Sequence, residues 1–120
     1  MKPKMNGGSA SYDSENDIAF FVVKTQTPYK HSILFDEKGL VVDLDESLSV
    51  RALEIFDASE QFGVSKAALK NIKGWTLSAK IDNAVMRVEA VLKVVVKGKV
   101  VEKKLVLKEK NEDHLPSSET

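Results

Sequence analysis

Cysteine is absent from this chain of 120 residues. Its absence excludes a disulfide framework and every site that depends on a thiolate, whether for metal binding or for covalent catalysis. Long apolar runs are absent too: none approaches the roughly 18–20 residues of a membrane-spanning helix, and no apolar core of a secretion signal follows Met1. Because nothing in the sequence requires an oxidising compartment, we expect a soluble, unprocessed protein of the cytoplasm.

The charged side chains are unevenly distributed, although 18 basic and 18 acidic residues leave no formal net charge. Residues 1–65 contain 6 basic and 11 acidic side chains, residues 66–110 contain 12 and 4, and residues 111–120 contain 0 and 3. This asymmetry favours an anionic partner for the second segment, or a contact with the acidic segment of another copy. The alternative is that folding mixes the two halves on one surface, so that their fields cancel.

Both ends of the chain are polar and lack hydrophobic periodicity. Residues 1–16 are rich in Gly and Ser, and residues 111–120 are acidic. Such segments cannot bury enough apolar surface to offset the loss of chain entropy, so both are predicted to be disordered tails. The hydrophobic content of 42% suits one modest core, and residues 17–110 are predicted to form a single domain.

The first half of that domain contains strand signals and then a change of period. Residues 18–23 (IAFFVV) are wholly apolar, and residues 33–35 and 40–44 flank a loop that contains a glycine, so three strands are predicted. After Ser49, a suitable N-cap, the apolar spacing becomes about 3.6, which predicts a helix that ends at Gly63. A second helix is predicted from the cap residue 65 to the glycine at 74.

Strand periodicity returns after residue 74. Residues 75–81 alternate between apolar and polar side chains, and residues 84–97 and 100–108 have the longest strand signals. The predicted order of elements is β-β-β-α-α-β-β-β. We therefore expect an α+β fold, with an antiparallel β-sheet of about six strands and a helical pair packed on one face.

The last two strands can be aligned from the turn between them. A two-residue loop at Lys97 and Gly98 places Val94 opposite Val101. A slip of one residue would turn apolar side chains to the wrong face, so this register is predicted. It requires a positive φ at Lys97, where Asn or Asp is usual.

Residues 55–74, IFDASEQFGVSKAALKNIKG, contain a possible turn glycine, Gly63, between two apolar-patterned segments. They resemble the helix-turn-helix DNA-binding motif of phage and bacterial repressors, in which the second helix lies in the major groove. Ser59 stands four positions before the glycine, where the motif usually has alanine. The residues that match the packing positions of the motif are Ala58, Phe62, Val64, Leu69 and Ile72. The alternative interpretation is a structural corner between two helices.

The resemblance implies that the second helix contacts nucleic acid. Lysines suit phosphates, and Asn71 can pair with an adenine edge. The lysine-rich hairpin can add phosphate contacts, although it lacks aromatic side chains on which bases stack. The predicted nucleic-acid-binding residues are Ser65, Lys66, Lys70, Asn71, Lys73, Lys97, Lys99 and Lys104. On this hypothesis the protein is a small regulatory or accessory nucleic-acid-binding protein.

The same hairpin supports a different class of function. In the predicted register both of its faces carry valines, so one face can cover the core while the other meets a partner. The alternative hypothesis is a protein–protein assembly module that forms a homodimer or a larger assembly through this hairpin. Lysines that prevent aggregation between sheets would then explain the basic residues without nucleic acid.

Signals for catalysis are weak. The two histidines, His31 and His114, are isolated in the sequence. Asp43 and Asp45 have a spacing that can place two carboxylates on one strand face, as a site for Mg²⁺, but such a pair more often marks the end of a strand. No phosphate-cradling glycine loop, nucleophile elbow or zinc-ligand spacing occurs. We therefore predict no enzymatic activity, no metal and no cofactor.

Overall fold

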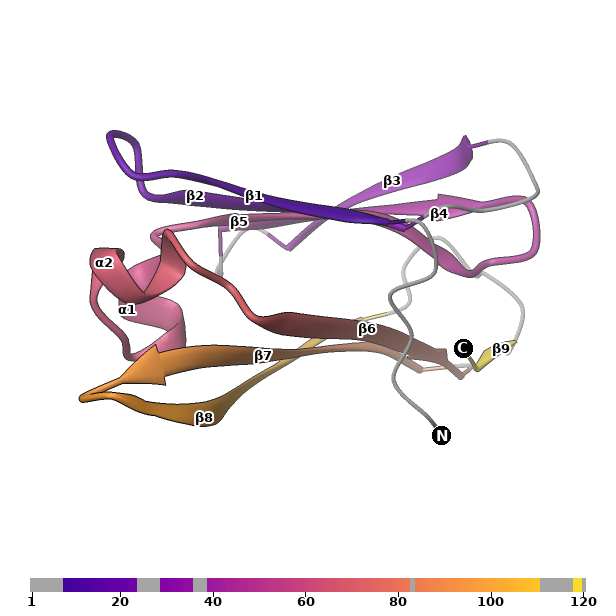
Figure 1. Ribbon diagram of the computed structural model, residues 1–120. Helices are drawn as coiled ribbons and strands as arrows, with labels where there is room; N and C mark the ends of the chain where they lie inside the picture. Colours follow the sequence, from indigo (N-terminus) through magenta and orange to yellow (C-terminus); the bar gives the residue numbers. More distant parts are fainter. Residues whose placement is uncertain (1–7, 24–28, 36–38, 83, 111–117, 120) are drawn as a thin grey trace.

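The computed structural model describes residues 8–23, 29–35, 39–82, 84–110 and 118–119. These residues form two antiparallel β-sheets that face each other, with two short helices between them at one end (Figure 1). No helix in these ranges is long and apolar enough to cross a membrane. The predicted class, α+β with antiparallel sheets, is confirmed. The single sheet of about six strands with a helical pair on one face is corrected, because the strands form two sheets and the helices lie between them.

Sheet A is built from the first half of the chain. Its strands are β1 (Ser9–Asp13), β2 (Ile18–Val22), β3 (Tyr29–Phe35), β4 (Leu40–Asp45) and β5 (Val50–Phe56), in the order β1-β2-β5-β4-β3. The chain therefore folds back so that β5 lies in the middle of the sheet, hydrogen-bonded to β2 and β4.

Strand β1 corrects the prediction of a disordered tail over residues 1–16. Ala10 and Tyr12 pack against the core, whereas Ser9, Ser11 and Asp13 are exposed. This is the period of two expected of an edge strand, and it was missed because small and polar residues dominate the segment. Residues 1–7 lie outside the described part of the chain.

Strand β5 replaces the first part of the helix predicted after Ser49. The register of β4 with β5 shifts between Asp43 and Leu44, whose partners are Ala52 and Val50, so β5 has one extra residue there. Such a bulge interrupts the alternation of inward-facing side chains. It produces an apolar spacing of three followed by two, at Val50, Leu53 and Ile55, which imitates the period of a helix.

Sheet B is built from the second half. Its strands are β6 (Gly74–Ile81), β7 (Val85–Val96), β8 (Lys99–Lys110) and β9 (Ser118–Glu119), in the order β8-β7-β6-β9. The predicted hairpin register is confirmed, since Val94 lies opposite Val101. Lys97 has a φ of 52° and Gly98 a φ of 78°, as a tight two-residue turn requires. Strand β9 lies in the predicted acidic tail, and residues 111–117 are outside the described ranges.

The helices are α1 (Ala58–Phe62) and α2 (Lys66–Leu69). Gly63 ends α1 with a φ of 68°, and the Ser65 hydroxyl caps α2 by accepting the backbone N–H of Ala68 at 3.1 Å. Both cap residues agree with the prediction, but the helices are only five and four residues long. Ile55 and Phe56 belong to β5 instead of the first helix, and Gly74 begins β6.

The hydrophobic core lies between the two sheets. Phe21 from β2 and Trp75 from β6 meet across this space with ring centroids 5.4 Å apart. Leu53 and Ile55 line the same space from sheet A, and the side chains of Met86, Val88, Ala90, Leu92 and Val94 line it from β7. The two halves of the chain, which differ in charge, thus become the two layers of a sandwich.

Candidate functional site

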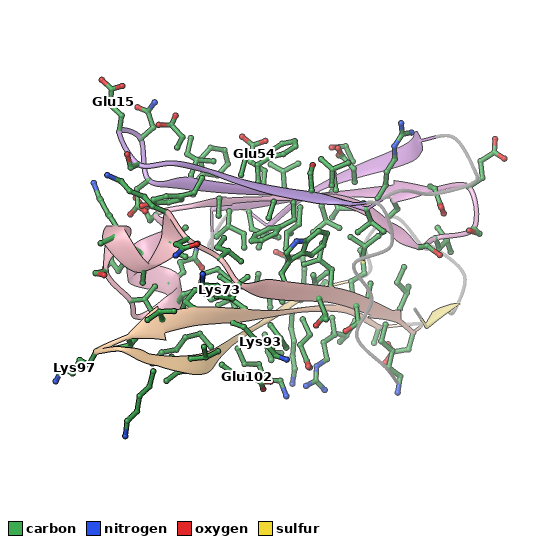
Figure 2. The ribbon with its side chains drawn as sticks, viewed as in Figure 1. Glu15, Glu54, Lys73, Lys93, Lys97 and Glu102 are labelled. Carbon is green, nitrogen blue, oxygen red and sulfur yellow. The ribbon has the colours of Figure 1, made fainter. Side chains whose placement is uncertain are left out.

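The outer side of sheet B carries more basic than acidic side chains. Because cross-strand partners share a face, the register assigns alternate residues of β6, β7 and β8 to the side that faces away from sheet A. Figure 2 shows Lys93 and Glu102 pointing away from the other layer on this side. We call this side the basic face. On strands β6, β7 and β8 it carries six basic and two acidic side chains, a net charge of +4: Lys80, Arg87, Lys93, Lys104, Lys108, Lys110, Glu89 and Glu102.

Three basic residues form a row across the basic face. Lys80 lies opposite Arg87, and Arg87 lies opposite Lys108. Like charges directly opposite each other destabilise a sheet. Glu89 relieves part of this repulsion, because it forms ion pairs with Arg87 at 3.5 Å and with Lys104 at 3.3 Å. Both cations are exposed, so these pairs contribute little to stability.

The basic face also has an apolar stripe along the hairpin. Val95 lies opposite Val100, and Val91 and Val106 continue the stripe along β7 and β8. Val100 is 62% exposed and Val106 is 36% exposed. Exposed valines beside lysines are the features that an interface needs in its centre and its rim.

The helical end of the sandwich holds most of the predicted nucleic-acid-binding residues. A groove of about 750 Å³ separates the helical pair from the β7–β8 hairpin, and Ser65, Asn71 and Lys97 line it. Lys103 lines the same groove. Lys103 is not among the residues predicted from the sequence, although the predicted register pairs it with Leu92 and so places it on the inner side of the hairpin.

A second groove, of about 520 Å³, lies between β1 and the segment from α2 to the start of β6. Lys70, Asn71 and Lys73 line it. Its shape depends on Gly8, since a Cβ there would lie 2.4 Å from the Val22 carbonyl oxygen and 2.9 Å from the Trp75 ring. The grooves meet at Asn71, which lines both.

The remaining predicted residues lie elsewhere. Lys104 is on the basic face, paired with Glu89. Lys99 lies opposite Val96, on the other side of the hairpin from Lys104. Lys66 is exposed on α2, where its charge contributes to lowering the pKa of Asp17 without forming an ion pair. The structure thus distributes the predicted residues over the helical end and both sides of the hairpin.

A hydrogen-bonded cluster around Asp17 fixes the helical end. The Asp17 carboxylate accepts the Tyr12 hydroxyl at 2.5 Å, the Ser59 hydroxyl at 2.6 Å and the Ser59 backbone N–H at 3.0 Å. Burial raises the pKa of Asp17, but these hydrogen bonds and the charge of Lys66 outweigh it and hold the pKa below its usual 3.8. Burial and the bond to Asp17 raise the pKa of Tyr12. Asp17 therefore acts as an N-cap for α1 in place of Asp57, whose side chain makes no capping bond.

The carboxylates considered for a metal have structural partners. Asp43 accepts the Ser32 hydroxyl at 2.8 Å, and buried Asp45 accepts the backbone N–H groups of Ser47 and Ser49 in the turn before β5. Among the described residues, no group of three or more His, Cys, Asp or Glu is placed to hold a metal ion. His114 and the side chain of His31 lie outside the described part of the structure.

The outer side of sheet A carries acidic side chains. The register assigns Asp13, Asp43 and Glu54 to the side that faces away from sheet B. We call this side the acidic face. Phe20, which is 38% exposed, lies on β2 opposite Glu54 of the middle strand β5. Its other apolar side chains are Ile18, Val22, Val41 and Phe56.

These observations define a small two-layer α+β protein with two charged outer faces. Residues 10–59, which span β1 to the start of α1, match the family described as "Protein of unknown function (DUF2283)". A protein of Methanosarcina mazei bearing the name "Putative hypoxanthine phosphoribosyltransferase" is 34% identical over 107 residues, which cover 89% of this chain and 85% of that protein. The chain belongs to the same family as the M. mazei protein. No solved structure gives a significant match.

Proposed function

We propose that the protein is a non-catalytic interaction module that assembles with a protein partner, most simply a second copy, through the basic face. The observation that carries the proposal is the exposure of Val100 and Val106 among the charged side chains of that face. The proposal includes a cytoplasmic location, with which the lack of cysteine is consistent.

The physical reason lies in the balance of apolar and charged groups. A sheet that faces water on one side usually alternates apolar inward with polar outward side chains. On the basic face valines interrupt that alternation, and a partner that covers them would gain about 25 cal/mol for each Å² of apolar surface removed from water. The surrounding charges would set the orientation and the rate of association.

Sedimentation velocity over a range of protein concentrations tests this proposal. Val100→Asp should abolish association while lowering the unfolding free energy by about 1 kcal/mol or less, because the side chain is largely in water. Ala67→Asp is the matched control, since Ala67 is exposed on α2, away from the basic face, and the change adds the same charge. Association of Val100→Asp equal to that of the wild type would reject the basic face as the interface.

Nucleic-acid binding is the second candidate function, favoured by the row Lys80, Arg87 and Lys108. Phosphates placed against this row would relieve its internal repulsion. Binding to duplex DNA should then weaken steeply as salt is added. Lys66→Glu with Lys70→Glu tests the helical end, and Lys108→Glu with Lys110→Glu tests the basic face. Absence of binding at low ionic strength would remove this candidate.

The name of the M. mazei relative suggests transfer of a phosphoribosyl group to hypoxanthine. Phosphate sites are commonly formed by a glycine-rich loop at the start of a helix. Among the described residues, α1 and α2 each have about one turn. A backbone N–H at the start of α1 already donates to the Asp17 carboxylate, and one at the start of α2 donates to the Ser65 hydroxyl. This arrangement supports a non-catalytic role. Formation of a nucleotide from hypoxanthine and a phosphoribosyl donor by the purified protein would contradict it.

A further inference from the structure

The acidic face is a second open surface that carries apolar side chains beside its carboxylates. Phe20 has Ser11 on one side and Glu54 on the other across the sheet. Glu54 makes no hydrogen bond or ion pair with another residue in the described ranges, and Figure 2 shows it pointing away from sheet A. Its charge is therefore available to a partner.

The signs of the two faces decide which surfaces can pair. The acidic face carries three described carboxylates, and strands β6, β7 and β8 give the basic face a net charge of +4. Two acidic faces, or two basic faces, would repel each other across an interface. An acidic face against a basic face would bring opposite charges together, with Phe20 and the valine stripe available to meet between them.

The two faces lie on opposite sides of the sandwich, as the directions of Glu54 and Lys93 show (Figure 2). A contact of one face with the other in a second copy is therefore heterologous, and it leaves one face free at each end. Such contacts close into rings only when the rotation between copies permits it, and otherwise they continue as open chains.

We propose that the acidic face binds the basic face of a second copy, so that the protein forms head-to-tail oligomers. This inference rests on the proposed assembly function and adds the identity and the polarity of the contact. It assigns Glu54 and Phe20 as the complement of Lys108, Lys110 and the valine stripe.

The size of sheet A limits the strength of the contact. Its five strands, of five to seven residues each, span a face of roughly 400–500 Å² at spacings of about 4.8 Å between strands and about 3.3 Å per residue. A standard protein–protein interface buries about 800 Å² on each partner. We therefore expect reversible oligomers whose dissociation constant is on the order of micromolar or weaker.

A mixing experiment tests the polarity. Glu54→Lys alters only the acidic face, and Lys108→Glu with Lys110→Glu alters only the basic face. Wild-type protein should show a series of species that grow with concentration in sedimentation velocity, whereas each variant alone should have a dissociation constant raised roughly tenfold or more. An equimolar mixture of the two variants should associate more strongly than either variant alone, because the unchanged basic face of one can meet the unchanged acidic face of the other.

The controls separate failure of this inference from failure of the proposed function. Glu54→Gln should weaken association less than Glu54→Lys, and circular dichroism should confirm that every variant is folded. If Val100→Asp abolishes association but Glu54→Lys does not, the basic face is an interface and the head-to-tail inference is overturned. A wild-type protein that forms only a closed dimer also overturns it, and a wild-type protein that stays monomeric overturns both proposals for a second copy.

Discussion

The Asp17 carboxylate accepts a hydrogen bond from the Ser59 hydroxyl at 2.6 Å, although 42 positions separate the two residues in the sequence. This bond joins the β1–β2 turn to the start of α1, and the Tyr12 hydroxyl binds the same carboxylate from β1. Ser59 lines the first groove and Tyr12 the second, so this one carboxylate binds a side chain of each groove.

Asp17→Asn should destabilise the protein by about 1–3 kcal/mol, because an amide cannot accept all three hydrogen bonds and places a donor where the carboxylate accepted. Chemical denaturation at pH 7 measures the change. Glu15→Gln is the matched control in the same turn, since the Glu15 side chain points into solvent and accepts no hydrogen bond from the described residues (Figure 2). An equal loss of stability in both variants would contradict the role assigned to Asp17.

The lowered pKa of Asp17 also predicts a dependence of stability on pH. Since its pKa is lower in the folded than in the unfolded state, the carboxylate contributes its full stabilisation above about pH 4. The contribution disappears as the pH falls through the folded-state value. The difference in unfolding free energy between wild type and Asp17→Asn should therefore shrink below pH 4. Some acid sensitivity should remain in the variant, because hydrogen bonds also lower the pKa of Asp13 and of Asp82.

Two adjacent phenylalanines in β2 allow the effect of core packing on stability to be measured separately from the effect of surface contact on association. Phe21 is fully buried against Trp75, so Phe21→Ala should cost about 3–5 kcal/mol of unfolding free energy. Phe20→Ala should cost less, roughly 1–2 kcal/mol, because the side chain is 38% exposed. Thermal denaturation distinguishes the two. If the acidic face is an interface, Phe20→Ala should reduce association at a much smaller loss of stability than Phe21→Ala causes, and the reverse result would contradict the assignment of faces.

The features that sequence analysis found correctly are local. The turn at Lys97 and Gly98, the alternation of β7 and β8 and the caps at Gly63 and Ser65 depend on neighbours within a few positions, so the pattern predicts them. The bulge in β5 broke the alternation on which strand prediction relies. It made a central strand resemble a helix, and the helix-turn-helix resemblance drew on that same segment.

The arrangement of the surfaces depends on contacts between distant segments. Nothing local in the sequence indicates that Phe21 faces Trp75, or that the chain divides into two sheets. The charge asymmetry was visible, and it persists in the fold because sheet A comes from the acidic half and sheet B from the basic half. The meeting of Asn71 with Lys103 around one groove could not be predicted, since it requires the end of the hairpin to pack against the helices.

Lys97 occupies a backbone conformation that disfavours its side chain. With a φ of 52°, it is in the left-handed region, which Asn adopts more readily than Lys. Lys97→Asn should raise the unfolding free energy by about 0.5–1 kcal/mol. Lys97→Ala should give no gain, because alanine shares the steric penalty at positive φ. Denaturant titration of the three proteins measures the differences, and equal stability of the Asn and Ala variants would show that the turn is not strained.

The row Lys80, Arg87 and Lys108 predicts a variant in which stability and binding change in opposite directions. Lys108→Glu places a carboxylate directly opposite Arg87 and removes one like-charge contact, so the unfolding free energy should rise by roughly 0.2–1 kcal/mol. Association through the basic face, and any binding of DNA, should weaken because the basic face loses a cation. Lys108→Gln, which removes the charge without reversing it, should give intermediate effects on both. Denaturation and sedimentation of the same samples test both expectations. A variant that is both more stable and more strongly associated would show that the row does not contact an anionic surface.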